Sequence, residues 1–360
     1  MAWRAMRAMT VKEFRQLQRD HRTLALLLFQ PLLLLVIFGY AASFDVDDVP
    51  TAVYGQAAEQ VASQLPDALA VRTVSPSGGR DDAQEELRGG QVVVAVLAPP
   101  DGPPQVLIDG SELFAARSVV TALARAPIQV QSEVLYNPDL ETPPVLVPAL
   151  AGLVLAFVGT LATSLGVVRE RQTGTIERLA VMPLRPSDVL AGKLLPYLLV
   201  ALVDLALVMT ASVVVFDVPF NGSVLLFVVG AAIFLAVTLG TGLLISTVSE
   251  NQGQAMQLSL MVTLPQVLLS GAIFPVESMA EAIQWIAYVL PLTWFVEIAR
   301  GVMLRAATWA DLGLPLAALV GLAVAVFALS IVRVRRDLLP ARGRPTTVAA
   351  EGVAIAGGQR

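Results

Sequence analysis

The sequence predicts an α-helical polytopic membrane protein of six transmembrane helices, with a small α/β extracytoplasmic domain inserted between the first and second helices. Two observations carry this prediction. The 360 residues are 56% hydrophobic and only 15% charged, with a mean hydropathy of +0.70, whereas soluble domains average about 25% charged residues. Several apolar runs also reach the roughly 20 residues that a helix needs to cross a bilayer.

The chain begins with a basic segment, residues 1–23, that precedes the first predicted span, Leu24–Ser43. Helical spacing places Trp3, Met6, Phe14 and Leu17 on one face, and most of the basic side chains lie opposite. This pattern predicts a cytoplasmic amphipathic helix in contact with membrane lipids. A basic flank that only sets the orientation of the first span is the alternative.

Residues 44–144 differ from the rest of the chain, with 15 acidic residues against five arginines, a net charge of 5 − 15 = −10. Short runs rich in Val, Ile and Leu alternate with helical patterns, which indicates a small α/β domain. The predicted strands are Thr51–Tyr54, Gln91–Leu97 and Gln105–Asp109. The predicted helices are Ala57–Leu69, Asp81–Arg88 and Glu112–Tyr136, the last broken at Pro127.

Residues 145–332 contain the second to sixth predicted spans. These are Val145–Val168, Leu194–Phe216, Ser223–Val248, Gln254–Ile273 and Leu312–Val332. The segment between the last two, residues 274–311, is too polar for a simple span and too apolar for a free loop, so it is predicted to be re-entrant or interfacial. The tail, residues 333–360, is basic and predicted to be partly disordered.

The distribution of Lys and Arg predicts the orientation of the chain in the membrane. The N-terminus, the charged segment 169–193 and the tail are the basic parts, and basic segments stay in the cytoplasm. Six spans place all three on that side of the plasma membrane and put residues 44–144 outside.

The sequence excludes several kinds of chemistry within this chain. It has no cysteine and one histidine, His21, so thiolate zinc sites, histidine metal clusters and histidine-based triads are excluded. The one Gly-Lys pair, Gly192-Lys193, lacks the rest of a phosphate-binding loop. We therefore expect no catalytic residues, no metal, no cofactor and no nucleic-acid partner, and active transport would need an outside energy source.

Asp204 lies near the middle of the third predicted span. A carboxylate at that depth is costly and usually faces a cavity or another helix. It is a candidate for the translocation path, and a hydrogen bond between helices is the alternative. An ion-coupled carrier that uses Asp204 is a rival function, although no second half of the sequence repeats the first.

The charged segment carries the most specific pattern. It reads Arg169-Glu170-Arg171, Thr173-Gly174-Thr175, Glu177, Met182-Pro183-Leu184-Arg185-Pro186 and Gly192-Lys193-Leu194-Leu195-Pro196. Further short motifs are Asp109-Gly110-Ser111, Tyr136-Asn137-Pro138, Ser270 to Pro275, Leu290-Pro291-Leu292 and Arg300-Gly301. In order and spacing, over roughly residues 10 to 335, the chain resembles the permease subunits of type-2 ABC exporters, in the branch with a large external domain.

This resemblance implies a permease that pairs with a second copy or a related permease and binds a separate cytoplasmic ATPase, which would hold ATP and Mg. It implies export of a hydrophobic or amphipathic substrate. The residues that would couple to the ATPase are Arg169, Glu170, Arg171, Thr173, Gly174, Thr175 and Glu177. Their charged groups suit charge-assisted hydrogen bonds with a partner, although two arginines at a span end can also serve only as membrane anchors.

The resemblance also implies that short helices within residues 274–300 dip into the outer leaflet, which makes Glu297 a second candidate for the translocation path. Its alternative is an ion pair with Arg300 one helical turn away. A membrane receptor or assembly protein that binds partners through the external domain is a further rival function.

Overall fold

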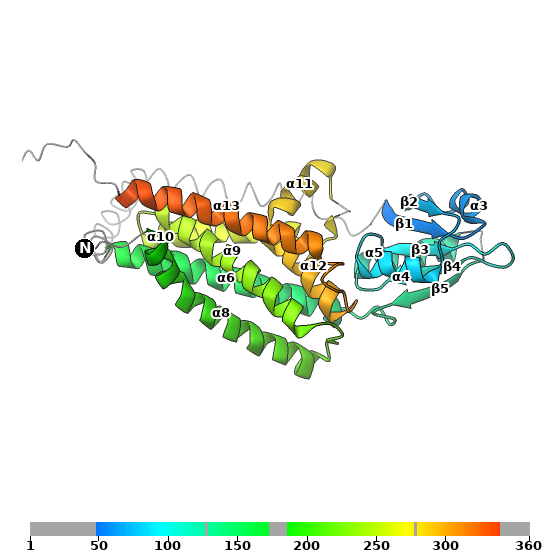
Figure 1. Cartoon of the computed structure of the whole chain (residues 1–360), viewed down its shortest axis with the longest axis horizontal. Helices are drawn as coiled ribbons and strands as arrows, with labels where there is room; N and C mark the ends of the chain where they lie inside the picture. Colours follow the sequence, from blue (N-terminus) through cyan, green and yellow to red (C-terminus); the bar gives the residue numbers. More distant parts are fainter. Residues whose placement is uncertain (1–47, 127–128, 173–185, 277–278, 339–360) are drawn as a thin grey trace, which may run out of the picture.

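The computed structural model describes residues 48–126, 129–172, 186–276 and 279–338, and has two parts (Figure 1). A sheet-containing unit, here called the α/β unit, lies at one end of a long bundle of helices. The predicted N-terminal helix (1–23), the first span (24–43) and most of the tail lie outside the described residues.

The α/β unit is built on a five-stranded mixed sheet. Its strands are β1 (Val49–Tyr54), β2 (Leu69–Ser75), β3 (Val94–Leu97), β4 (Gln105–Asp109) and β5 (Gln131–Leu135). The order is β2-β1-β3-β4-β5, with β3 and β4 antiparallel and the other pairs parallel. All six residues of β1 are buried, as expected for a parallel strand covered on both faces.

Three helices cover the sheet: α3 (Ala58–Ala62), α4 (Arg80–Arg88) and α5 (Leu113–Arg125). The start of α4 is fixed by Asp82, whose carboxylate accepts a hydrogen bond of 2.8 Å from the Gly79 N–H. The helix ends at Gly89, and Gly90 follows with φ of +69°, a conformation that favours glycine. On α5, the residues Ala116 and Val119 pack against the sheet.

Two of the predicted elements in this unit are wrong. The expected helix Ala57–Leu69 shortens to Ala58–Ala62, and the strand β2 follows it. The expected helix Glu112–Tyr136 ends at Arg125, and β5 follows. Both missed strands are the edges of the sheet. Edge strands are half-exposed and carry polar residues, so they lack the continuous apolar run that marks a central strand.

The bundle contains five long helices that run along the long axis of the molecule (Figure 1). They are α6 (Pro143–Gln172), α8 (Pro186–Phe216), α9 (Val224–Val248), α10 (Gln252–Leu269) and α13 (Gly313–Leu338). Close packing of α6 and α9 depends on small residues, because a Cβ on Gly242 would lie 2.5 Å from the Thr160 carbonyl oxygen.

Within the described residues, four helices are long and apolar enough to span a membrane: Pro143–Gln172, Pro196–Phe216, Val224–Val248 and Gly313–Arg333. Each matches a predicted span. The predicted span Gln254–Ile273 corresponds to α10, which ends at Leu269 and is not among the four. Its glutamines lower its apolar character, so the count of six remains a prediction.

The segment predicted to be re-entrant contains two short helices, α11 (Glu281–Val289) and α12 (Pro291–Met303), whose axes differ by 77°. The bend is at Leu290, which has an extended backbone, and Pro291 then starts α12. The helix α12 is embedded in the bundle core, where Phe295 stacks on Phe234 with ring centroids 4.4 Å apart. Such a bent pair fits either a broken span or a re-entrant hairpin.

Candidate functional site

The α/β unit meets the helical bundle through a set of ion pairs, here called the junction network. Its members are Arg88, Asp109, Glu112, Glu297, Arg300, Arg305 and Asp311. Three come from the α/β unit and four from α12 and the loop that follows it. Within the part of the chain that the structure describes, no group of three or more metal-ligating side chains occurs.

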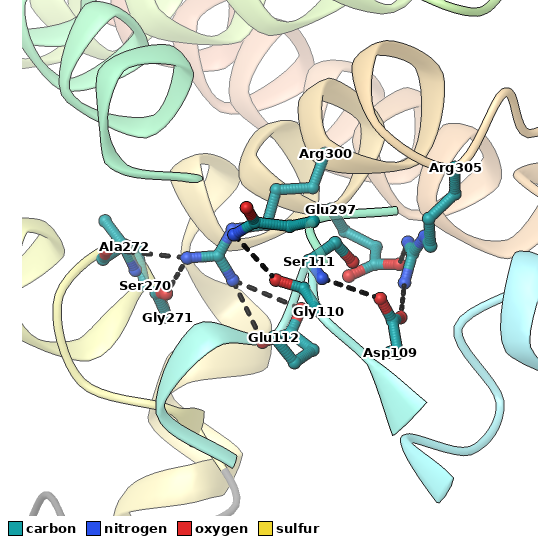
Figure 2. A network of polar contacts seen from close by, with 11 residues as sticks. Asp109, Gly110, Ser111, Glu112, Ser270, Gly271, Ala272, Glu297, Arg300 and Arg305 are labelled. Atoms are coloured by element: carbon teal, nitrogen blue, oxygen red, sulfur yellow. Dashed lines mark hydrogen bonds and ion pairs between the residues drawn. The ribbon is translucent and has the colours of Figure 1, made fainter. Parts of the chain in front are cut away.

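The carboxylates of the α/β unit are placed by the turn that follows β4. Asp109 ends this strand, and its Oδ1 accepts a hydrogen bond of 2.8 Å from the Ser111 N–H. A Cβ on Gly110 would lie 2.8 Å from the carbonyl oxygens of Leu135 and Asn137, so only glycine fits this turn. The turn therefore points Asp109 and Glu112 at the bundle (Figure 2).

Asn137 holds the same turn from the segment that leads into α6. Its Nδ2 donates to the carbonyl oxygens of Glu141, at 2.9 Å, and Gly110, at 3.3 Å. Its Oδ1 accepts from the Glu141 N–H at 3.0 Å. Two of the motifs singled out in the sequence, Asp109-Gly110-Ser111 and Tyr136-Asn137-Pro138, are thus parts of one structure.

Arg300, on α12, joins three segments. Its Nη1 donates to both carboxylate oxygens of Glu112, at 3.2 and 3.1 Å. Its Nη2 donates to the Gly271 carbonyl oxygen at 3.0 Å, in the loop between α10 and α11. The side chain is 6% exposed, and this donor geometry suits a guanidinium group better than an ammonium.

Arg305 follows α12 and lies between two carboxylates. Its Nη1 is 3.3 Å from Asp109 Oδ2, and its Nη2 pairs with Glu297 (Figure 2). The side chains of Arg305 and Asp109 are each 1% exposed. The turn after α4 comes close to this cluster, since a Cβ on Gly90 would lie 2.6 Å from Glu297 Oε1.

A fourth ion pair lies at the side of this cluster. Arg88 Nε, at the end of α4, is 3.1 Å from Asp311 Oδ2. Asp311 also accepts from the N–H and the hydroxyl of Thr308, at 2.7 and 2.8 Å. This carboxylate therefore fixes the loop between α12 and α13 and ties it to the α/β unit.

Burial and charge shift several pKa values at the junction. Burial raises the pKa of Asp109, and the Arg305 guanidinium opposes that rise. Burial, and then the Asp109 charge, raise the pKa of Tyr136 to about 12. Burial alone would lower the pKa of Arg305, but Glu297 and Asp109 raise it, so this guanidinium stays charged.

A cavity of about 310 Å³ lies between the two parts of the molecule. Its walls include Gln91 of the α/β unit, Tyr288 of α11, Trp294 and Glu297 of α12, and Leu314 of α13. The aromatic rings of Tyr288 and Trp294 lie 5.7 Å apart. The cavity thus has an aromatic wall beside the charged junction.

The structure separates the two residues predicted for the translocation path. Glu297 belongs to the junction network, where it pairs with Arg305 and not with Arg300 as helical spacing suggested. Arg300 instead turns toward Glu112, because the α/β unit presents a carboxylate to it. Asp204 lies half-buried on α8, outside the network.

The predicted coupling segment is described only in part. Arg169, Glu170 and Arg171 form the last turn of α6, with Arg169 exposed and the other two half-buried. The neighbouring Gln172 accepts a hydrogen bond of 3.0 Å from Gln252 Nε2, at the start of α10. Thr173, Gly174, Thr175 and Glu177 lie outside the described residues.

Helix α6 connects the two sites. Its 30 residues run without a break from Pro143, next to the junction, to Gln172, a length of about 45 Å at 1.5 Å per residue. Pro148 is the sixth residue of the helix, so it lies past the first turn and removes one backbone hydrogen bond near the start of α6. The junction network and the described start of the predicted coupling segment, Arg169 to Gln172, therefore lie at opposite ends of α6.

Sequence reasoning missed Arg305, Asp109 and Glu112 as interacting residues. The motifs that contain Asp109 and Arg300 were recognised, but nothing in their spacing indicated that they meet. A sequence signal was present in the charges Glu297 and Arg300 within the otherwise apolar α12 and in Arg305 just after it.

These features define a class of protein: a polytopic helical membrane protein that carries an α/β unit at one end of its bundle. A family model described as "ABC-2 family transporter protein" matches residues 21–332. The chain belongs to this family, and it is an ABC-2 permease with several transmembrane helices.

Similar proteins have related descriptions. The chain is 31% identical over 340 residues to "Probable multidrug ABC transporter permease YbhS" of Escherichia coli K12, covering 84% of this chain and 89% of that protein. It is 27% identical over 327 residues to the permease YbhR, covering 82% and 89%. It is 31% identical over 219 residues to "Inner membrane transport permease YhhJ", covering 59% and 57%.

Proposed function

We propose that this chain is the permease subunit of an ATP-driven exporter, and that it moves hydrophobic or amphipathic molecules out of the cell. A separate cytoplasmic ABC ATPase would bind ATP and Mg and supply the energy. Two permease copies, or this chain and a related permease, would form the path. The match of residues 21–332 to ABC-2 transporters supports this proposal.

The observation that carries the coupling mechanism is the continuity of α6. One unbroken helix connects Glu170, at its charged end, with the turn that precedes Pro143. A rigid helix transmits a displacement along its whole length, so movement of the ATPase at one end reaches the junction at the other. Arg169, Glu170 and Arg171, with Thr173, Gly174, Thr175 and Glu177, would form the contact with the ATPase.

The proposed orientation follows from this role. The charged end of α6 and both termini lie in the cytoplasm, and the α/β unit lies outside the plasma membrane, since the basic segments stay inside. Lipids would surround the exposed apolar faces of α8, such as those of Leu199, Val203 and Leu207.

The experiment is co-purification of this permease with a candidate ABC ATPase from the same organism. The wild-type permease is expected to retain the ATPase and to support ATP-dependent transport of an amphipathic dye. Glu170→Lys and Glu177→Lys are expected to lose both, while Glu59→Lys, an exposed acid on α3, keeps both. Full retention of ATPase and transport in the two coupling variants would overturn this mechanism.

A further inference from the structure

Two buried arginines, Arg300 and Arg305, form ion pairs that join α12 and the loop after it to the α/β unit. Counted over the whole residue, Arg300 and Arg305 are 5% and 2% exposed, and Asp109, the partner of Arg305, is fully buried. Charges that have left water are stable only while they remain paired, because separation leaves an uncompensated charge in a poorly solvated site. The contact between α12 and the α/β unit is therefore one that resists opening.

Ion pairs and hydrogen bonds hold α12 on both of its sides. Arg300 binds Glu112 and also the Gly271 carbonyl oxygen, so it fixes the loop after α10. On the other side, Arg88 and Asp311 join the end of α4 to the loop before α13. With Arg305 between them, these contacts hold α12 at several points, which prevents rotation as well as separation.

Helix α11 is held by packing and hydrogen bonds. Trp285, Ile286 and Val289 on its outer face are 72%, 52% and 64% exposed. Its inner face packs through Ala287 and Ile283 onto the end of α10 and the loop after it. Among the side chains that the structure describes, none from α11 belongs to the junction network. The printed links from α12 to α11 are hydrogen bonds, from Thr293 Oγ1 to the Ala287 carbonyl oxygen at 2.7 Å and from Trp294 Nε1 to the Tyr288 carbonyl oxygen at 2.8 Å.

The backbone between the two helices is bent at one residue, and the two hydrogen bonds from α12 to α11 cross this bend. Leu290 is extended, with φ of −83° and ψ of 129°, and interrupts the helical hydrogen bonds between α11 and α12. The 77° bend lies at this residue. The cavity of about 310 Å³ has Tyr288 of α11 on one wall and Gln91 of the α/β unit on another. A rotation of α11 about Leu290 would therefore change the cavity while its α12 wall stays in place.

We propose that α12 and the α/β unit move as one body, with Arg300 and Arg305 as positioning residues, and that α11, hinged at Leu290, is the segment that moves against them. This inference rests on the proposed function for the step that drives α11. The existence of the single body does not depend on it.

Distances between paired spin labels test the inference on the full-length permease. The natural chain has no cysteine, so two introduced cysteines give one labelled pair. Asp81, exposed on α4, is the reference site. Trp309, 48% exposed after α12, and Trp285, on α11, are the second sites. In nanodiscs, Asp81→Cys with Trp309→Cys is expected to give a narrow distance distribution, and Asp81→Cys with Trp285→Cys a broader one.

A matched pair of arginine variants shows whether the ion pairs cause the difference. Arg305→Gln is expected to broaden the distribution for positions 81 and 309. Arg80→Gln, which breaks an exposed pair with Glu133 inside the α/β unit, is expected to leave it unchanged. Glu112→Gln, at a side chain that is 19% exposed, replaces Arg305→Gln if that variant does not fold. A wild-type distribution for 81 and 309 as broad as that for 81 and 285 overturns the single body.

The same label pairs in the complex with the ATPase, trapped with ATP and vanadate, test the moving segment. The distance from 81 to 285 is expected to shift, and that from 81 to 309 to stay the same. A shift in the second distance overturns the single body, and no shift in the first overturns the role of α11. Failure of the ATPase to bind contradicts the proposed function alone, because the measurements on the isolated permease still decide whether α12 and the α/β unit form one body.

Discussion

Arg305 Nη1 lies 3.3 Å from Asp109 Oδ2, although the two residues are 196 positions apart in the chain. Both side chains are 1% exposed. The pair joins the end of a strand in the α/β unit to the end of α12 in the bundle. Of the four ion pairs in the junction network, this one has the least exposed side chains.

Replacement of Arg305 by Met is expected to destabilise the protein strongly. The change leaves Asp109 and Glu297 without the cation between them, and removal of one partner from a buried pair costs about 3–5 kcal/mol. The free energy of unfolding of the purified permease measures the loss. Arg80→Met is the control, because its pair with Glu133 is 40% and 43% exposed and such pairs contribute less than about 1 kcal/mol.

The double variant Arg305→Met with Asp109→Asn sharpens this prediction. It removes one of the two stranded carboxylates, so it is expected to be more stable than Arg305→Met alone. Equal losses in Arg305→Met and Arg80→Met would contradict a buried pair at the junction.

Gly90→Ala is expected to destabilise the junction for two reasons. Gly90 has φ of +69°, which costs an L-residue about 1–2 kcal/mol. Its Cβ would also lie 2.6 Å from Glu297 Oε1 and 2.8 Å from Arg305 Nη1, and overpacking adds about 1–3 kcal/mol. Thermal unfolding measures the sum.

Gly102→Ala separates the two contributions. Gly102 has φ of +113° and nothing within 4 Å of an added Cβ, so its variant carries backbone strain without a clash. Because this φ lies further from the left-handed region, it sets an upper value for the strain at Gly90. A loss in Gly90→Ala no larger than in Gly102→Ala would show that α4 does not approach the arginines closely.

The sequence predicted the parts of this fold that depend on local pattern. A 20-residue apolar run has few alternatives to a helix, so the long helices within the described residues were found. Some of their ends differ: α8 begins at Pro186 and not at the predicted Leu194, and α13 ends at Leu338 and not at the predicted Val332. Central strands such as Gln105–Asp109 were found because they are short runs of buried apolar residues. The edge strands β2 and β5 were missed because edge strands tolerate residues such as Arg72 and Glu133.

The junction could not be predicted in the same way. Helical spacing paired Glu297 with Arg300, which is the favoured local partner in an isolated helix. In the folded chain, Glu112 approaches Arg300 from another unit, and Arg305 takes Glu297. The choice among several oppositely charged partners is decided by tertiary position, and residues almost 200 positions apart leave no local trace of it.

Asp311→Asn is expected to show a pH-dependent loss of stability. Burial tends to raise the pKa of Asp311, but hydrogen bonds from the Thr308 N–H and hydroxyl and the charge of Arg88 bring the pKa below its usual range. The folded state therefore binds this proton less tightly than the unfolded state does. The ionised carboxylate stabilises the fold above the unfolded pKa, about 3.9, and this contribution is lost as the pH falls through the lowered folded pKa.

The measurement is the difference in unfolding free energy between wild type and Asp311→Asn at a series of pH values. The difference is expected to be about 1.5–3 kcal/mol at pH 7, the range for hydrogen bonds to charged groups, and to decrease below about pH 4. Asp101→Asn, at an exposed loop position, serves as the control. A difference that stays constant down to pH 3 would contradict a carboxylate held in its ionised form.

Asp204→Asn distinguishes an ATP-driven exporter from an ion-coupled carrier. Asp204 lies on α8 between Val203 and Leu207, which are 60% and 64% exposed, and it has no part in the junction network. The exporter predicts that ethidium uptake into inverted vesicles changes by less than about tenfold, equivalent to about 1.4 kcal/mol. Replacement of the phosphate-binding lysine of the ATPase is expected to abolish uptake. Loss of uptake in Asp204→Asn with an ATP-independent wild type would favour the carrier.

Gly242→Ala tests the packing that keeps α6 straight between the junction and the coupling segment. A Cβ at this position would lie 2.5 Å from the Thr160 carbonyl oxygen and 2.9 Å from Thr163 Cβ, so α9 would be forced away from α6. The expected loss is about 1–3 kcal/mol of unfolding free energy. Gly321→Ala, on α13 with open space around the added Cβ, is expected to be neutral or stabilising, since alanine favours a helix by about 1 kcal/mol over glycine.

If α6 transmits the movement of the ATPase, Gly242→Ala also lowers transport more than it lowers ATP hydrolysis, whereas Gly321→Ala leaves their ratio unchanged. An unchanged ratio in Gly242→Ala, together with a measurable loss of stability, would assign this contact to folding alone.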